Sequence, residues 1–326
     1  MRWLAFAIVL LGGSALAADP LPALDAEKEY TASGVSSGAY MAVQLHVAHS
    51  AVLKGAAAIA GGPYYCAQGS FWTAYYNCMA PGWFTPLPSV ERLKDEASRR
   101  ARDGRVDSTA NLESARVWLF SGAEDETVTR EVVDGLHDFY RLFKAQIALV
   151  GDKPAGHGMI TAHAGNACSV TAAPYINDCD YDAAGELLAH LLGKLHAGKA
   201  VASSVIGFDQ TPFGGHDISM AEEGYVYIPQ VCRSERCRVH VAFHGCRQTT
   251  RDIGERFVRE AGYNGWAEAN RLIVLYPQAT KRYFGIYNPR GCWDWWGYTG
   301  PQYATKDGPQ IRAVKAMLER LSAPRQ

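Results

Sequence analysis

The chain has 326 residues, 48% of them hydrophobic, so it is long enough to bury a sizeable core and has an ordinary length for a single α/β domain. Its 32 Lys and Arg residues nearly balance its 33 Asp and Glu residues, which argues against nucleic acid or an anionic membrane as the main partner. An uncharged substrate fits this composition better.

The first residues predict a signal for export. Arg2 precedes an apolar run over residues 3–11, and small residues follow up to Ala18. This is the pattern of a cleaved secretory signal. A membrane anchor fits less well, because the apolar run falls short of the roughly 20 residues that cross a bilayer. We expect a signal peptide over residues 1–18 and a secreted chain, periplasmic or extracellular, over residues 19–326.

A strand, a sharp turn and a helix are expected next. Residues 29–33 have the pattern of a strand and residues 39–49 that of a helix, and Gly34-Val35-Ser36-Ser37-Gly38 lies between them. A serine on such a strained turn is exposed at the top of the sheet, and a larger residue in place of the glycines would clash. Ser36, rather than Ser37, is the expected nucleophile, and the Ser37 N–H is one expected oxyanion donor.

The remaining elements follow in alternation. We expect strands over residues 55–60, 115–120, 145–150, 225–229, 239–243 and 272–276, and helices over 89–102, 129–143 and 182–196. Residues 62–88, rich in aromatic residues, Gly and Pro, predict a stapled loop near the site, and residues 199–220 a connection. The alternation predicts a parallel sheet with helices on both faces, in one domain without a separate polymer-binding module.

An acid is expected in the loop after residues 115–120. Active sites of parallel sheets lie at the carboxyl ends of the strands, and Asp125 is the best-placed carboxylate there. Glu124 and Glu126 are the alternatives. The acid is needed because a catalytic histidine requires a carboxylate to fix its tautomer and to stabilise its charge.

A base is expected in the loop after residues 145–150. Gly156-His157-Gly158 lies in this loop, and the flanking glycines would let the imidazole reach back to Ser36. His163 is the alternative. A serine hydroxyl becomes a good nucleophile only when a histidine removes its proton, so Ser36, Asp125 and His157 form the expected triad.

The order of the motifs predicts an unusual topology. The strand over 239–243 leads into His244-Gly245-Cys246, which looks like an oxyanion-hole strand end, so the Cys246 N–H is the second expected donor. In ordinary α/β-hydrolases the oxyanion motif precedes the nucleophile, whereas here it follows about two hundred residues later. The two can meet only if the sheet is circularly permuted.

Eight cysteines in an exported chain predict disulfides. Three close pairs suggest themselves, and two cysteines remain for a long-range bridge, although sequence alone does not fix the connectivity. The pairs are Cys66 with Cys78, Cys168 with Cys179, Cys232 with Cys237, and Cys246 with Cys292. A zinc site of Cys232, Cys237, His240 and His244 is disfavoured, because a packed His240 on the strand is the simpler interpretation.

Three tryptophans lie close together near the C-terminus. Trp293, Trp295 and Trp296 lie in a stretch too polar and glycine-broken for a core helix. They form either a locally packed aromatic cluster or an apolar platform for an uncharged substrate, which a Cys246–Cys292 bridge would tie to the oxyanion loop.

Four segments together resemble one family. Residues 34–41, 174–185, 244–246 and 292–298 are similar to the secreted polyhydroxybutyrate depolymerases, which have a circularly permuted α/β-hydrolase fold. The resemblance spans nearly the whole mature chain. It implies the triad and the oxyanion amides named above, and a tryptophan of the 293–296 segment in a substrate subsite, with Trp295 and Trp296 favoured. It implies no metal and no organic cofactor.

The expected activity is hydrolysis of ester bonds in short-chain polyhydroxyalkanoate, through an acyl-enzyme on Ser36 that water activated by His157 releases. The expected partner is a polyester or oligoester, and the sequence does not indicate an oligomeric state. Two alternatives are a feruloyl- or acetyl-type esterase acting on plant polysaccharide and a non-catalytic polymer-binding protein that keeps the fold.

Overall fold

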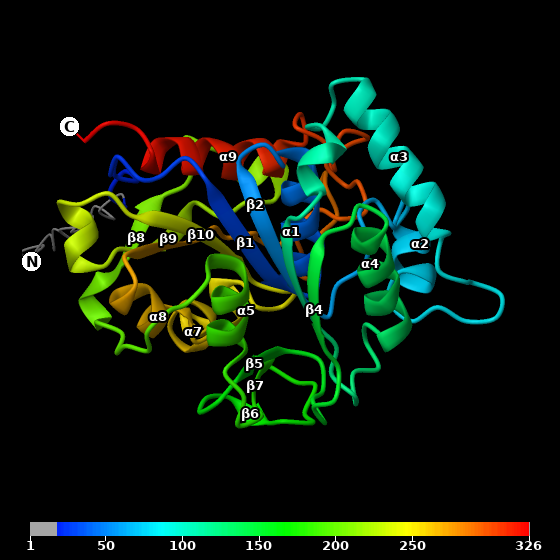
Figure 1. The fold of residues 1–326 in the computed structure, drawn as a ribbon, viewed down its shortest axis with the longest axis horizontal. Helices are drawn as coiled ribbons and strands as arrows, with labels where there is room; N and C mark the ends of the chain where they lie inside the picture. Colours follow the sequence, from blue (N-terminus) through cyan, green and yellow to red (C-terminus); the bar gives the residue numbers. More distant parts are fainter. Residues whose placement is uncertain (1–17, 326) are drawn as a thin grey trace, which may run out of the picture.

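A computed structural model describes residues 18–325 (Figure 1). Apart from Ala18, the predicted signal peptide lies outside the described residues. No helix within the described range is long and apolar enough to cross a bilayer.

The centre of the molecule is a sheet of eight strands in the order β4-β3-β2-β1-β10-β11-β9-β8. The strands from β4 to β11 in this order run parallel, while β9 is antiparallel to both of its neighbours. Along the chain these strands are β1 (Tyr30–Val35), β2 (Leu53–Ile59), β3 (Arg116–Phe120), β4 (Gln146–Val150), β8 (Val205–Asp209), β9 (Glu223–Tyr227), β10 (Arg238–Phe243) and β11 (Leu272–Tyr276). The prediction of a mostly parallel sheet is confirmed.

Helices cover both faces of this sheet. On one face α1 packs against β1, β2 and α9, and its His46 contacts Tyr140 of α4. On the other face α5 packs against β2, β3 and α8. The helices are α1 (Ser37–Ala48), α2 (Phe71–Asn77), α3 (Val90–Arg102), α4 (Arg130–Arg141), α5 (Ala183–Leu192), α6 (Thr250–Ile253), α7 (Arg256–Glu260), α8 (Tyr263–Ala269) and α9 (Pro309–Leu321).

Several segments are more regular than expected. Residues 244–271 and 299–325, for which no helix was expected, contain α6 to α8 and α9. Residues 62–88, expected as a loop without regular elements, contain helix α2, which begins after the cap Ser70. The expected connection over 199–220 contains the edge strand β8. A second small sheet of β5 (Met159–Thr161), β6 (Asn166–Ala167) and β7 (Ile176–Asp178) follows the loop of His157.

The permuted order of the motifs is reflected in the strand pairing. Strand β1 lies between β2 and β10, with Gly34 opposite Phe243. The residues that follow these two strands therefore lie at the same edge of the sheet, although about two hundred residues separate them in sequence. The circularly permuted fold brings the serine turn and the His244-Gly245-Cys246 segment together.

Four disulfides tie the loops to this framework. All four expected pairs form: Cys66–Cys78, Cys168–Cys179, Cys232–Cys237 and Cys246–Cys292. The alternative zinc site is wrong, because the sulfurs of Cys232 and Cys237 are bonded to each other. His240 is fully buried, and its two ring nitrogens are hydrogen-bonded to the hydroxyls of Thr31 and Ser33 at 2.7 Å each.

Candidate active site

Ser36 lies in the tight turn between β1 and α1. Its backbone has φ 56° and ψ −123°, a strained conformation for a residue with a side chain. A Cβ on Gly34 would lie 2.2 Å from the Gly38 carbonyl oxygen, and a Cβ on Gly38 would lie 2.4 Å from the His244 carbonyl oxygen. Only glycine fits at either position, so the two glycines allow the turn to close against the end of β10.

Asp125 and His157 form a buried pair. His157 Nδ1 lies 2.8 Å from Asp125 Oδ2, and both side chains are almost completely buried. Asp125 Oδ1 accepts hydrogen bonds from the backbone N–H groups of Thr127 and Val128, at 2.8 and 3.0 Å. A carboxylate held in this way accepts the Nδ1 proton of His157, so Nε2 carries the lone pair that a general base needs.

The alternative residues lie elsewhere. Glu124 and Glu126 flank Asp125 but are exposed, and His163 is exposed beyond β5. None of the three makes a hydrogen bond with Ser36 or His157 within residues 18–325. The geometry therefore favours Asp125 and His157.

Ser36 and His157 line the same cleft of about 280 Å³, together with Gly245, Cys246 and Gln248. In the described chain no hydrogen bond joins the Ser36 hydroxyl to His157. Catalytic hydrogen bonds are often long without substrate and shorten in the reactive complex. The cleft thus brings the expected nucleophile and the expected base to one small volume open to a ligand.

Two backbone N–H groups, those of Ser37 next to Ser36 and of Cys246 in the cleft lining, have no acceptor among the described residues. Neither the Ser37 N–H nor the Cys246 N–H donates a hydrogen bond to any described residue. The first belongs to the opening turn of α1, where helix N–H groups lack partners within the helix. Unpaired N–H groups on either side of a nucleophile are the donors that a developing oxyanion requires.

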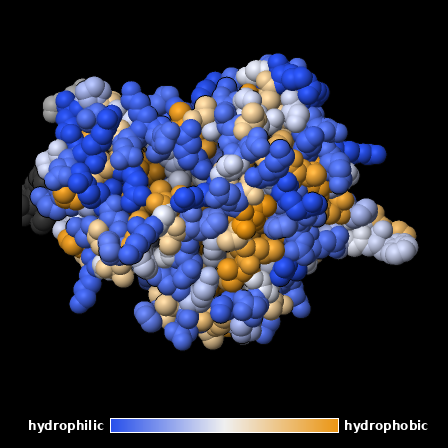
Figure 2. All heavy atoms as spheres, in the orientation of Figure 1, coloured by the Kyte–Doolittle hydropathy of each residue, from blue (hydrophilic) through white to orange (hydrophobic). Residues whose placement is uncertain are grey.

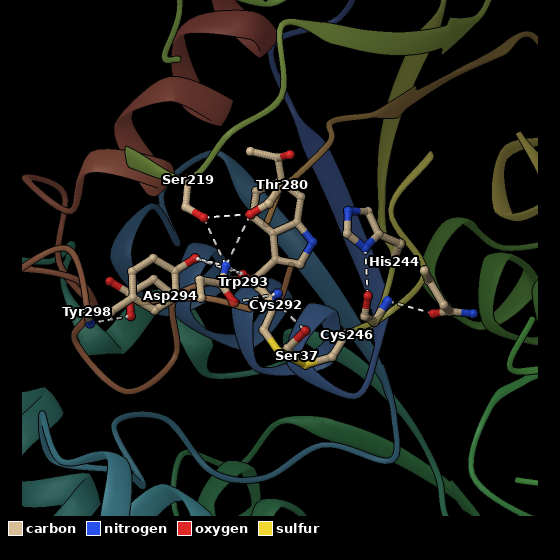
Figure 3. The surroundings of a disulfide bond; sticks show 12 residues. Ser37, Ser219, His244, Cys246, Thr280, Cys292, Trp293, Asp294 and Tyr298 are labelled. Carbon is tan, nitrogen blue, oxygen red and sulfur yellow. Dashed lines mark hydrogen bonds between the residues drawn. A yellow bond between two sulfur atoms is a disulfide. The ribbon is translucent and has the colours of Figure 1, made fainter. Parts of the chain in front are cut away.

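The disulfide between Cys246 and Cys292 fixes one side of this region (Figure 3). The Cys292 N–H donates to Asn288 Oδ1 at 3.0 Å, and Asn288 Nδ2 donates to the Cys292 carbonyl at 2.8 Å. The Trp293 N–H donates to Ser37 Oγ at 3.3 Å. The Ser37 side chain therefore supports the C-terminal loop, while its backbone N–H stays without an acceptor among the described residues.

A larger, mainly apolar cavity of about 680 Å³ adjoins the cleft. The two share Met79, Cys246 and Arg290 among their lining residues. Trp295 and Trp296 line the cavity, and the ring of Trp295 stacks on Tyr40 with centroids 4.1 Å apart.

Trp293 lies in a different place from its two neighbours. Its side chain is fully buried, packs against Phe243 and His244, and lines neither cavity. The expectation that Trp293 contributes to a substrate platform is therefore not retained, since its ring has no exposed surface to offer. For this residue the structure agrees with the alternative of local aromatic packing.

Asp294 organises the loop that carries Trp295 and Trp296. Its carboxylate accepts hydrogen bonds from the backbone N–H groups of Gly297, Tyr298 and Thr299 and from the Thr299 hydroxyl. Burial raises the pKa of this carboxyl, while these hydrogen bonds favour the charged form. The tight loop lets Trp293 point inward and Trp296 toward the cavity.

No family model matches the chain. The chain is 36% identical over 333 residues to a polyhydroxybutyrate depolymerase of Talaromyces funiculosus, and the match covers 96% of each protein. The chain belongs to the polyhydroxybutyrate (PHB) depolymerase family. It is also 42% identical over 328 residues to a poly(3-hydroxybutyrate) depolymerase of Delftia acidovorans, a match that covers 97% of this chain but spans 65% of the length of that protein.

Two solved structures have the same fold. They are the PHB depolymerase from Penicillium funiculosum and a PHB depolymerase carrying a serine-to-alanine change, complexed with an R3HB trimer. Each has a TM-score of 0.85 and 33% identity, covering 94% of this chain and 100% of the other. PHB depolymerases are carboxylic ester hydrolases, and the hydrolase fold expected from the sequence is confirmed.

Several residues of the candidate site were absent from the expected set. Phe71 and Tyr75 of α2 line the apolar cavity, and Met79 and Arg290 lie where cavity and cleft meet. Aromatic residues four apart, as Phe71 and Tyr75 are, follow the period of a helix and were the available signal. For Met79 and Arg290 the sequence carries no such pattern. Among residues 18–325 no cluster of His, Cys, Asp and Glu suitable for a metal ion is found.

Proposed function

We propose that this chain hydrolyses the ester bonds of poly(3-hydroxybutyrate) or its oligomers. Ser36 attacks the ester carbonyl while His157 Nε2 takes its proton, and Asp125 stabilises the charged imidazole. The Ser37 and Cys246 N–H groups stabilise the oxyanion. The alcohol leaves with a proton from His157, and water activated by the same histidine then releases the acyl group.

The observation that carries this proposal is the joining of two cavities. A small cleft lined by Ser36 and by His157 of the buried His–Asp pair adjoins an apolar cavity lined by aromatic rings, and the N–H groups of Ser37 and Cys246 are unpaired among the described residues. An uncharged aliphatic polyester offers ester carbonyls for the first and apolar segments for the second. Membership of the PHB depolymerase family and the R3HB trimer bound to a solved relative support the same substrate class.

Large exposed apolar side chains on the described surface support an insoluble substrate. Trp83 and Phe84, on the turn between α2 and α3, are 92% and 93% exposed, and Phe284 is 87% exposed. The loop between α2 and α3 projects from the body of the molecule, and pale and apolar atoms form its tip (Figures 1 and 2). Large exposed apolar side chains mark interaction surfaces, and a solid polyester is an apolar partner.

The compartment follows from the same proposal. A polymer particle or its oligomers would be met in the periplasm or outside the cell, where disulfides persist. The four disulfides support an oxidising compartment.

The experiment compares wild type with Ser36→Ala on amorphous poly(3-hydroxybutyrate), measuring soluble hydroxybutyrate products, with a feruloylated polysaccharide in parallel. Wild type should release products from the polyester, and Ser36→Ala should release them at least about 10⁴-fold more slowly. Ser234→Ala, a change at an exposed serine, is the matched control. Activity confined to the polysaccharide would overturn the substrate, and equal rates for wild type and Ser36→Ala would overturn serine catalysis.

A further inference from the structure

Gly245 is held through both of its backbone groups. Its N–H donates to Gln248 Oε1 at 2.6 Å, and its carbonyl oxygen lies 2.7 Å from His244 Nδ1 (Figure 3). His244 is fully buried and Gln248 is 2% exposed. We call these two side chains the Gly245 clamp.

The backbone around His244 fixes its tautomer. The Ala279 N–H donates to His244 Nε2 at 3.1 Å, so Nε2 carries no proton. The Gly245 carbonyl can only accept, so the proton lies on Nδ1 and is donated to it. A second proton would oppose the Ala279 N–H, and burial lowers the pKa of His244 to about 4. The His244 side chain of the clamp is therefore a neutral hydrogen-bond donor of fixed direction.

The orientation of Gln248 is fixed in the same way. Its Oε1 accepts from the Gly245 N–H, while its Nε2 donates to the carbonyl oxygens of Pro174 and Tyr175, at 3.0 and 2.9 Å. The Tyr175 carbonyl also accepts from the Met159 N–H, two residues after His157. Gln248 thus ties the oxyanion segment to the segment that carries the base.

The Gly245 carbonyl and the Cys246 N–H belong to one peptide unit. A trans peptide is planar, and its C=O and N–H point in opposite directions. A hydrogen bond that holds the oxygen therefore also sets where the N–H points. The Cys246 N–H is the donor without an acceptor at the Ser36 cleft, so His244 acts on its direction through one rigid plane.

Resting on the proposed serine hydrolysis, we propose that His244, together with Gln248, is a positioning residue that aims the Cys246 N–H at the oxyanion. Because residue 245 is a glycine, its backbone needs hydrogen bonds from its surroundings to hold one conformation. A Cβ there would lie 2.9 Å from Gln248 Oε1 and 3.2 Å from the Val35 carbonyl oxygen, so a larger residue would crowd the clamp and the serine turn. Glycine is also the residue whose backbone rotates most freely, and the clamp removes that freedom.

The clamp and the disulfide hold different parts of the chain around the Cys246 N–H. The disulfide holds the side chain of Cys246, but rotation of the preceding peptide plane leaves that side chain in place. The His244 hydrogen bond opposes this rotation. Its loss should weaken binding of the transition state more than binding of the substrate.

The test replaces His244 by Phe, which keeps a ring but removes both nitrogens, and by Asn, whose Nδ2 retains a donor near the position of Nδ1. We would measure kcat and KM on 4-nitrophenyl butyrate and the affinity for a butyl boronic acid, whose tetrahedral serine adduct places an oxygen in the oxyanion hole. His46→Phe is the matched control, because His46 is also fully buried but contacts Tyr140 of α4. All rates are taken per folded protein.

For His244→Phe we expect kcat and boronate affinity to fall together by roughly 10- to 100-fold, with little change in KM. This loss is smaller than the roughly 10²- to 10³-fold fall in kcat that follows complete loss of an oxyanion donor, because the Cys246 N–H is still present. His244→Asn should recover part of both, and His46→Phe should keep both. Wild-type values for His244→Phe, or an equal loss in His46→Phe, would overturn the inference. If the wild-type protein hydrolyses 4-nitrophenyl butyrate but releases no product from the polyester, only the proposed polyester substrate is overturned. If the wild-type protein hydrolyses neither compound, both proposals are overturned.

Discussion

At Ser36 the backbone and the chemistry are linked. The strained conformation places the hydroxyl above the carboxyl edge of β1, and the same turn leaves the Ser37 N–H without an acceptor. Asp125 reaches this region from the loop after β3, where two backbone N–H groups hold its carboxylate. Each proposed catalytic group is thus positioned by backbone contacts as well as by its own side chain.

Replacement of Asp125 by Asn tests the proposed role of its carboxylate. The Asn amide can donate to His157 Nδ1 and so favour the tautomer in which Nε2 carries the proton and cannot act as a base. We expect kcat on 4-nitrophenyl butyrate to fall by about 10⁴-fold. Glu126→Gln, at an exposed position one residue away, should keep the wild-type rate. The reverse result, with Glu126→Gln inactive and Asp125→Asn active, would move the acid to Glu126.

At the scale of elements, most strands of the large sheet were predicted and several helices were missed, among them α9, although its buried residues follow a helical period. The strands that became β1 to β4 and β9 to β11 were recognised, because buried strands carry apolar runs. Helix α2 was missed because Gly, Pro and Cys surround it, and only its Ser70 cap and its aromatic spacing mark it. Strand β8 is partly exposed and contains Gly207, so its pattern is weak.

The residues of the candidate site also fall into those that the sequence predicts and those that it does not. The expected triad and oxyanion residues lie in motifs that follow a strand end, and the structure brings Ser36, His157 and Cys246 to one cleft. The tryptophans lie in an irregular loop, where side-chain direction follows from the hydrogen bonds of Asp294 rather than from any period. That is why Trp293 was expected at the cavity although it lies in the core.

The Cys246–Cys292 bridge gives a prediction for the loop elements. Changing both residues to Ser should lower kcat by roughly 10-fold or more, because the bridge holds the residue whose N–H is the proposed oxyanion donor. The matched control changes Cys232 and Cys237 to Ser, removing a bridge that closes a separation of only 5 residues and lines neither cavity. Both double variants should unfold at a lower temperature. A wild-type kcat in the first would contradict this role.

The projecting loop between α2 and α3 gives a second prediction at this scale. Trp83→Ser with Phe84→Ser removes two rings that are more than nine-tenths exposed. We expect binding to polyester particles and product release from them to fall several-fold, while kcat on 4-nitrophenyl butyrate stays the same, since neither residue lines the cavity or the cleft. Equal adsorption of variant and wild type, measured by depletion from the supernatant, would exclude this loop as a polymer contact.

At the scale of the whole molecule, the order in which the chain supplies the strands of the sheet determines how the proposed site is assembled. The Ser36 turn and the Cys246 segment of the proposed site lie about two hundred residues apart in sequence and meet because β1 pairs with β10. Strand β1 also carries Thr31 and Ser33, whose hydroxyls hold His240 of β10. A buried histidine therefore lies at the centre of the joined sheet, and buried histidines bear on the stability of the whole fold.

Three fully buried histidines make stability depend on pH. Burial lowers the pKa of His46 and His240 to about 3 and that of His244 to about 4. In the unfolded chain histidine titrates near a pKa of about 6.5. Between about pH 4 and pH 6.5 the unfolded state therefore binds more protons than the folded state, so the free energy of unfolding rises with pH in this window and falls as the pH is lowered through it.

Well below the unfolded pKa each such histidine contributes a slope of about 1.4 kcal/mol per pH unit. Urea unfolding at about pH 7, 6 and 5 should thus show a steep loss of stability toward the lowest pH. His46→Phe removes one titrating group and should lower the slope near pH 5 by about that amount, even if the variant is less stable at neutral pH. Because His46 makes its one hydrogen bond to the uncharged Tyr140 hydroxyl, no ion pair is lost with it. An unchanged free energy of unfolding between pH 7 and 5 would mean that these histidines are protonated in the folded protein.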